Sequence, residues 1–112
     1  MKLRLNAGKL RLRLKQSEVA RLGETGRVED SVTFAPGQTL SYVLESGSDT
    51  CVTASFEKNQ IRVGLPAAMA KTWIESDQTG IEGTGVLIEK DFQCIHPQTE
   101  DDKDGFPNPM FK

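Results

Sequence analysis

The chain begins with two short segments in which basic residues and leucine alternate strictly. Lys2-Leu3-Arg4-Leu5 and Lys9-Leu10-Arg11-Leu12-Arg13-Leu14 flank the turn-forming residues Asn6-Ala7-Gly8. Because successive side chains of a strand point to opposite faces, this alternation predicts a β-hairpin with one leucine face and one basic face. The basic face would hold Lys2, Arg4, Lys9, Arg11 and Arg13.

Alternation resumes further along the chain, and two helices are expected between the strands. Further strands are expected at residues 27–34, 39–44, 51–56, 61–65 and 86–92. Ser17 is expected to cap a helix that ends at Gly26, and Pro66 to be the first residue of a second helix. Residues 76–85 hold three glycines and are expected to form a turn. The only repeated stretch of sequence is Lys-Leu-Arg-Leu at residues 2–5 and 9–12, and it does not predict a repeat protein.

Ordering 112 residues costs about 1.5 kcal/mol per residue, so nearly every apolar strand face must be buried. Two short helices cannot cover a wide flat sheet, so the sheet is expected to curl or the chain to dimerise. The sequence therefore predicts an α+β fold, mostly antiparallel, with a curled sheet or half-barrel of six to seven strands and two short helices. Residues 1–96 are expected to form a single domain and residues 97–112 an acidic, proline-containing tail.

The formal net charge of −2 conceals an uneven distribution. Residues 1–27 hold eight basic and two acidic residues, for a net charge of +6, and residues 28–112 hold six basic and fourteen acidic residues, for −8. Like charges on adjacent strands repel one another unless something offsets them. A bound polyanion, a nucleotide or the protein's own acidic residues could each offset the basic hairpin face, and the sequence leaves these alternatives open. No aromatic residues for base stacking are interleaved on that face.

The common signatures of catalysis and membrane insertion are absent from the sequence. There is no phosphate-binding Gly-x-x-x-x-Gly-Lys-Ser/Thr loop, no Gly-x-Ser-x-Gly elbow and no apolar run that could span a bilayer. The N-terminal segment lacks the unbroken apolar block of a signal peptide, so a cytoplasmic protein is expected. No cofactor and no metal are expected.

Two weaker groupings of polar residues remain as candidate sites. Cys94 and the only histidine, His96, follow Lys90 and Asp91, which could mark a small enzyme or metal site, although closed zinc sites need more Cys and His ligands. Lys90 is in phase with apolar Ile88, as Asp30 is with Val28. A buried lysine needs a partner, so Asp30 and Lys90 could form an ion pair at a pocket, or Lys90 could instead reach water from a strand end.

Several stretches together resemble a known family. They are Leu10-Arg11-Leu12-Arg13-Leu14, Ser17-Glu18-Val19-Ala20-Arg21-Leu22, Leu65-Pro66-Ala67-Ala68, Trp73, Ser76-Asp77-Gln78-Thr79-Gly80, Glu89-Lys90-Asp91-Phe92-Gln93-Cys94 and Pro107-Asn108-Pro109. In this pattern, which covers nearly the whole chain, the sequence is similar to a family of short bacterial proteins known only as a domain of unknown function. The resemblance implies a bacterial, cytoplasmic protein and brings no activity, ligand or catalytic residue.

The leading hypothesis is therefore a non-enzymatic binding or protein-interaction module, with a protein partner or a second copy bound at the basic face or at a sheet edge. The first alternative is polyanion or nucleotide binding through Lys2, Arg4, Lys9, Arg11 and Arg13. The second is a small enzyme or metal site near Lys90, Asp91, Cys94 and His96.

Overall fold

The computed structural model describes residues 1–92 as an α+β fold with eight strands and two helices. The elements follow in the order β1 (Lys2–Asn6), β2 (Lys9–Leu14), α1 (Gln16–Thr25), β3 (Arg27–Ala35), β4 (Gln38–Gly47), β5 (Thr53–Glu57), β6 (Gln60–Pro66), α2 (Ala67–Glu75), β7 (Gly80–Gly83) and β8 (Val86–Lys90). No helix in this part of the chain is long and apolar enough to cross a membrane.

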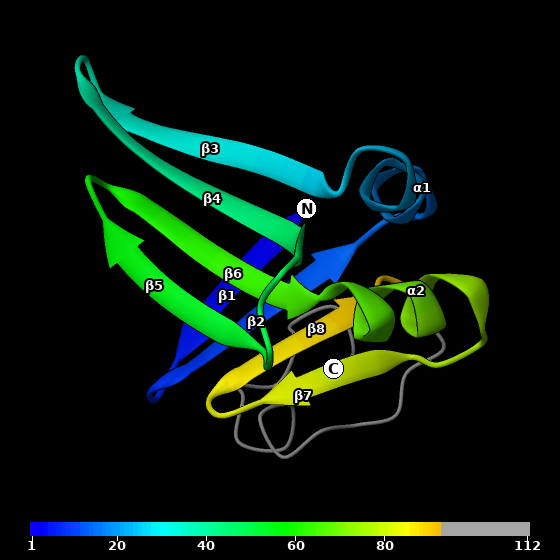
Figure 1. The fold of residues 1–112 in the computed structure, drawn as a ribbon. Helices are drawn as coiled ribbons and strands as arrows, with labels where there is room; N and C mark the ends of the chain where they lie inside the picture. Colours follow the sequence, from blue (N-terminus) through cyan, green and yellow to red (C-terminus); the bar gives the residue numbers. More distant parts are fainter. Residues whose placement is uncertain (93–112) are drawn as a thin grey trace, which may run out of the picture.

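The strands form two separate four-stranded sheets (Figure 1). The order is β1-β2-β8-β7 in the first sheet and β3-β4-β6-β5 in the second. The central pairs, β2 with β8 and β4 with β6, are parallel, whereas the outer pairs are antiparallel hairpins. The expectation of one curled, mostly antiparallel sheet of six to seven strands is thus only partly correct. The class is α+β, but the sheets are two, mixed and not closed.

The missed strand is β7, in the stretch expected to be a turn because of its glycines. A Cβ at Gly83 would lie 2.7 Å from the Cβ of Val52, so a side chain there would collide with the segment that leads into β5. The glycine therefore permits a close approach between two parts of the chain inside a strand, which local sequence patterns do not distinguish from a turn.

The topology repeats itself, although the sequence shows no matching repeat. Residues 2–47 and residues 53–90 each form a hairpin, a helix and a second hairpin. The first hairpin of each half pairs with the second hairpin of the other half, through β2 with β8 and through β6 with β4. Each sheet therefore needs both halves of the chain, and the two halves are related by a pseudo-two-fold arrangement.

Corresponding positions in the two halves carry corresponding contacts. Arg11 of β2 lies 3.1 Å from Glu89 of β8, and Arg62 of β6 lies 3.3 Å from Glu45 of β4. The helices correspond as well. Leu22 of α1 and Trp73 of α2 are both fully buried. Each lies eight residues after the last buried residue of the preceding strand, which is Leu14 in β2 and Leu65 in β6. The structural repeat thus extends to packing and ion pairs.

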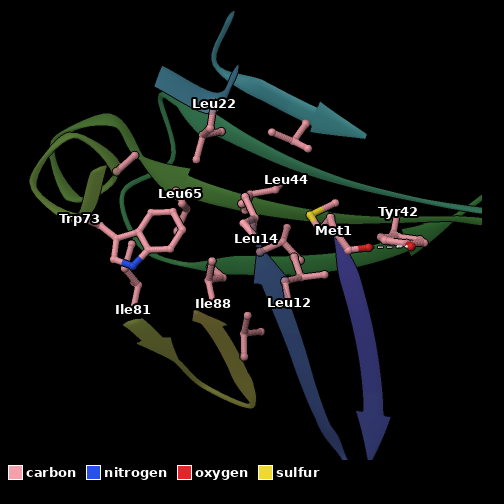
Figure 2. Close-up of a cluster of buried hydrophobic side chains, with 14 of the residues drawn as sticks. Met1, Leu12, Leu14, Leu22, Tyr42, Leu44, Leu65, Trp73, Ile81 and Ile88 are labelled. Atoms are coloured by element: carbon pink, nitrogen blue, oxygen red, sulfur yellow. Dashed lines mark hydrogen bonds between the residues drawn. The ribbon is translucent and has the colours of Figure 1, made fainter. Parts of the chain in front are cut away.

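The core lies between the two sheets and the helices, as Figure 2 shows. Its largest fully buried side chains come from both sheets and both helices, and they are Leu12, Leu14, Leu22, Leu44, Leu65, Trp73 and Ile88. The indole nitrogen of Trp73 donates a hydrogen bond to the carbonyl of Thr79, 3.2 Å away, which ties α2 to the start of β7. The only tryptophan of the chain is thus fully buried at the end of this core beside α2 (Figure 2).

The helix ends correct two expectations and confirm one. Helix α1 begins at Gln16, with Lys15 rather than Ser17 at the cap position, because the carboxylate of Glu18 accepts a hydrogen bond from the Lys15 backbone N–H. Pro66 is the last residue of β6 and the cap of α2, so it precedes the helix instead of opening it. Gly26 ends α1 with φ of 75°, a left-handed conformation that suits glycine, as expected.

Candidate functional site

The basic face exists as expected, and the structure places acidic residues against it. The register of β1 and β2 sets Lys2 opposite Arg13 and Arg4 opposite Arg11. Strand β8 lies beside β2 and contributes Glu89, whose Oε1 lies 3.1 Å from Nε of Arg11 and 3.8 Å from Nε of Arg13. Arg11 and Arg13, one from each of these like-charged pairs, therefore share the carboxylate of Glu89.

Further contacts offset more of this charge. Nζ of Lys2 lies 3.1 Å from Oδ2 of Asp91, which follows β8 directly. The Oε1 atom of Glu89 is buried and accepts no hydrogen bond of good geometry, so its contact with the arginines is ionic. The basic face is thus partly compensated by the chain itself, through a parallel strand pairing that the sequence did not predict.

The second grouping, Asp30 and Lys90, is not assembled into an ion pair. Asp30 lies near the amino group of Met1, with its Oδ2 3.5 Å from the nitrogen. Lys90 donates instead to the carbonyl of Ser76, 2.7 Å away, and its Nζ lies 5.6 Å from the centre of the Trp73 ring. Because Lys90 is the last residue of β8, its side chain extends past the core edge, in line with the strand-end alternative.

A hollow does lie beside Lys90. It has a volume of about 480 Å³ and is lined by Leu14, Val19, Ile74, Lys90, Asp91 and Phe92, among others. Cys94 and His96 lie outside the described residues. Within residues 1–92, no three His, Cys, Asp or Glu side chains form a group that could hold a metal ion.

The amino group of Met1 is held inside the molecule. It contacts the carboxylate of Glu18 as well as that of Asp30, and the phenol of Tyr42 donates a hydrogen bond to the Met1 carbonyl, 3.0 Å away (Figure 2). Burial raises the pKa of Tyr42, and the nearby charges of Asp30 and Glu18 raise it further. These contacts hold the start of β1 against α1 and β3 and are structural in character.

Exposed apolar side chains lie at the end of the molecule opposite the helices, as well as beside the helices, where Phe92 is exposed. Both β2 and β6 run from a hairpin turn into a helix, so the turns Ala7-Gly8 and Lys58-Asn59 lie away from the helical end. Near these turns the cross-strand pairs are Leu5 with Leu10 and Phe56 with Ile61, which are equivalent in the two halves. Leu5 is 59% exposed and Phe56 is 64% exposed.

These residues line an open hollow that we call the mouth. It has a volume of about 430 Å³ and is lined by Leu5, Leu10, Leu40, Ala54, Ser55, Phe56 and Ile61. None of these residues is charged, and most are apolar. At the helical end, Leu22 and Trp73 fill the space between the sheets, whereas nothing fills the mouth among the described residues. Within residues 1–92, helices therefore cover the core at one end and no helix or strand covers it at the mouth.

The hairpin of β3 and β4 projects beside the mouth. Strand β4 pairs with β6 only from Ser41 onward, so residues 32–40 extend beyond the neighbouring strand and form what we call the arm (Figure 1). The arm exposes Val32 by 43% and Phe34 by 70%, and Phe34 lies at an irregularity in the pairing of β3 with β4. The equivalent hairpin of β7 and β8 is shorter by five residues in each strand.

Sequence reasoning missed the mouth and the arm. The alternation placed Leu5 and Phe56 on apolar strand faces, and nearly every such face was expected to be buried. One signal was present in the sequence, since residues 32–40 contain no charged residue in a chain that is 27% charged. Exposed strand edges usually carry charges that prevent association, so an uncharged projecting hairpin is unusual.

Comparison with known proteins identifies the family and nothing beyond it. The model of the family of unknown function DUF7009 matches residues 1–110, and the chain belongs to this family. No curated protein and no solved structure matches the chain. The resemblance seen in the sequence is thereby confirmed at the level of the family.

Proposed function

We propose that this member of a family of unknown function is a non-enzymatic protein-interaction module that holds an apolar protein segment in its mouth. The observation that carries the proposal is the exposure of Leu5 and Phe56 in an uncharged hollow at the uncapped end of the core. Soluble domains rarely leave contiguous apolar patches uncovered, and those that do usually use them for binding. The resemblance found in the sequence supports placing the module in the bacterial cytoplasm.

A neutral aromatic probe tests the proposal directly. N-acetyl-phenylalaninamide, titrated into protein with labelled methyl groups, is expected to shift the NMR signals of Leu5, Leu10, Leu40 and Ile61 and to leave Leu14 and Leu22 in place. Substituting Phe56→Thr removes one wall of the mouth and should weaken these shifts, whereas Met69→Thr, on exposed α2, should not. Shifts spread over the surface, or unchanged in Phe56→Thr, would count against the mouth as a binding site.

A second candidate function, polyanion binding, is favoured by the charge that remains on the first sheet. The outer face of this sheet carries Lys2, Arg4, Lys9, Arg11 and Arg13, against the three acids Glu82, Glu89 and Asp91. Binding to a short duplex DNA at low salt should then weaken steeply as salt rises. The double substitution Arg11→Gln with Arg13→Gln should reduce both the affinity and the salt dependence, and unchanged binding would remove this candidate.

A further inference from the structure

The arm and the mouth belong to the same chain, and both are uncharged and expose apolar side chains. Residues 32–40 of the arm contain no charge, and neither does the lining of the mouth. The arm presents Phe34, the most exposed large apolar side chain of the described residues, and the mouth presents Phe56 and Leu5. A foreign partner would have to supply both an apolar insert for the mouth and an apolar cover for the arm, whereas a second copy of the chain supplies both.

The fold itself does not require the arm. The short hairpin of β7 and β8 completes its own sheet with five residues in β8 paired to β2. The longer hairpin of β3 and β4 pairs with β6 over seven positions and then continues past it. The extra length therefore adds exposed surface and no backbone pairing with the neighbouring strand, and only Leu40 at its base packs against the core.

The exposed apolar side chains of the arm and the mouth supply much of the area that a dimer needs. With about 200 Å² for a phenylalanine side chain, Phe34 and Phe56 together expose roughly 270 Å² in each copy. Leu5 and Val32 raise this to roughly 450 Å², or about 900 Å² over two copies. These four side chains alone would thus supply about three quarters of the lower limit of about 1,200 Å² for specific interfaces, and the rest of the arm and mouth would supply the remainder.

We propose, building on the proposed function, that the partner is a second copy of this chain and that each copy inserts the Phe34 tip of its arm into the other's mouth. The contact is reciprocal, since arm meets mouth twice about a two-fold axis, and such an arrangement closes at a dimer. The bulge at Phe34 turns the tip of the arm relative to the rest of β3, as bulges at strand ends commonly do.

Sedimentation velocity of the full chain, from low to several hundred micromolar, tests this arrangement. Wild type should shift from monomer to dimer with concentration. Phe34→Asp in the arm and Phe56→Asp in the mouth should each raise the dimer dissociation constant about thirtyfold or more. Met69→Asp, an exposed apolar position on α2, is the matched control and should dimerise as wild type does. Trp73 fluorescence and circular dichroism report whether each variant is folded, and Phe34→Thr and Phe56→Thr replace any that is not.

Mixing the two variants distinguishes reciprocal insertion from other dimers. A heterodimer of Phe34→Asp with Phe56→Asp keeps one intact arm-in-mouth contact, whereas each homodimer keeps none. The mixture should therefore associate at concentrations at which neither variant does so alone. A wild type that stays monomeric throughout, or a mixture as dissociated as its components, overturns the inference. If the probe N-acetyl-phenylalaninamide still shifts the mouth methyl groups of such a monomer, the proposed function stands while the dimer fails.

Discussion

At the scale of single residues, the chain uses its few special side chains as structural anchors. Its only tyrosine, Tyr42, hydrogen-bonds to the Met1 carbonyl beside two carboxylates, and its only tryptophan, Trp73, fills the core beneath α2. Lys90 reaches over the Trp73 ring to a backbone carbonyl. Trp73 and Lys90 lie at the helical end, Tyr42 lies on the opposite side of the core (Figure 2), and none of the three lines the mouth.

The titration of Tyr42 is a prediction at this scale. Burial and the charges of Asp30 and Glu18 raise its pKa above the ordinary 10.0. The folded state therefore retains the phenolic proton more strongly than the unfolded state. The resulting stabilisation is fully present below pH 10 and is lost as the pH rises through the folded pKa. Absorbance at 295 nm reports this group alone, since the chain has one tyrosine.

The same titration of Tyr42 in the Asp30→Asn variant separates the effect of burial on the pKa from the effect of the Asp30 charge. Removing one negative charge should lower the midpoint toward the ordinary value without abolishing the effect of burial, which is the larger cause. A wild-type midpoint at or below pH 10, or no change in Asp30→Asn, would show that the phenol is not enclosed as described.

At the scale of elements, local sequence predicted hairpins and helices well and pairings between distant strands poorly. The alternation of Lys2 to Leu14 and the glycine at position 26 specify their own geometry, so the first hairpin and the end of α1 were confirmed. Strand β7 was missed because Gly80 and Gly83 resemble a turn. The parallel pairing of β2 with β8 joins positions that lie 76 residues apart, and no local pattern encodes it.

The candidate site shows the same limit. The basic face was predicted from periodicity, but its compensation by Glu89 depends on the distant pairing with β8. The mouth could not be predicted, because alternation tells which face of a strand is apolar and not whether another element covers that face. Leu12 and Leu5 lie in the same leucine pattern, yet Leu12 is buried and Leu5 is exposed.

Two glycines give a prediction at the element scale. A Cβ at Gly23 of α1 would lie 3.6 Å from Ile74 of α2, an ordinary contact, so Gly23→Ala should stabilise the protein by about 0.5–1 kcal/mol through helix propensity. A Cβ at Gly83 would lie 2.7 Å from Val52, so Gly83→Ala should destabilise it. Urea unfolding followed by Trp73 fluorescence measures both. A destabilised Gly23→Ala would mean that the two helices pack more tightly than described.

At the scale of the whole molecule, each half of the chain pairs its first hairpin with the second hairpin of the other half. Among the described residues, the shared core is covered by the helices at one end and left uncovered at the mouth. The two halves share the order and pairing of their elements and differ most in strand length at the arm, where the hairpin of β3 and β4 is longer than its counterpart. Stability accounts for the symmetric part. The open mouth and the extended arm leave apolar side chains in water, and we propose that these side chains serve binding.

The central claim, that the mouth serves binding rather than folding, is tested most directly by the free energy of unfolding of Phe56→Thr. Threonine keeps the strand propensity of β5 while removing the ring. Measured by urea at low protein concentration, the substitution should change the free energy by no more than about 0.5 kcal/mol. Ile61→Ala, at the buried position paired with Phe56, should cost about 2 kcal/mol or more. A comparable loss in Phe56→Thr would contradict the account, because Phe56 would then belong to the core.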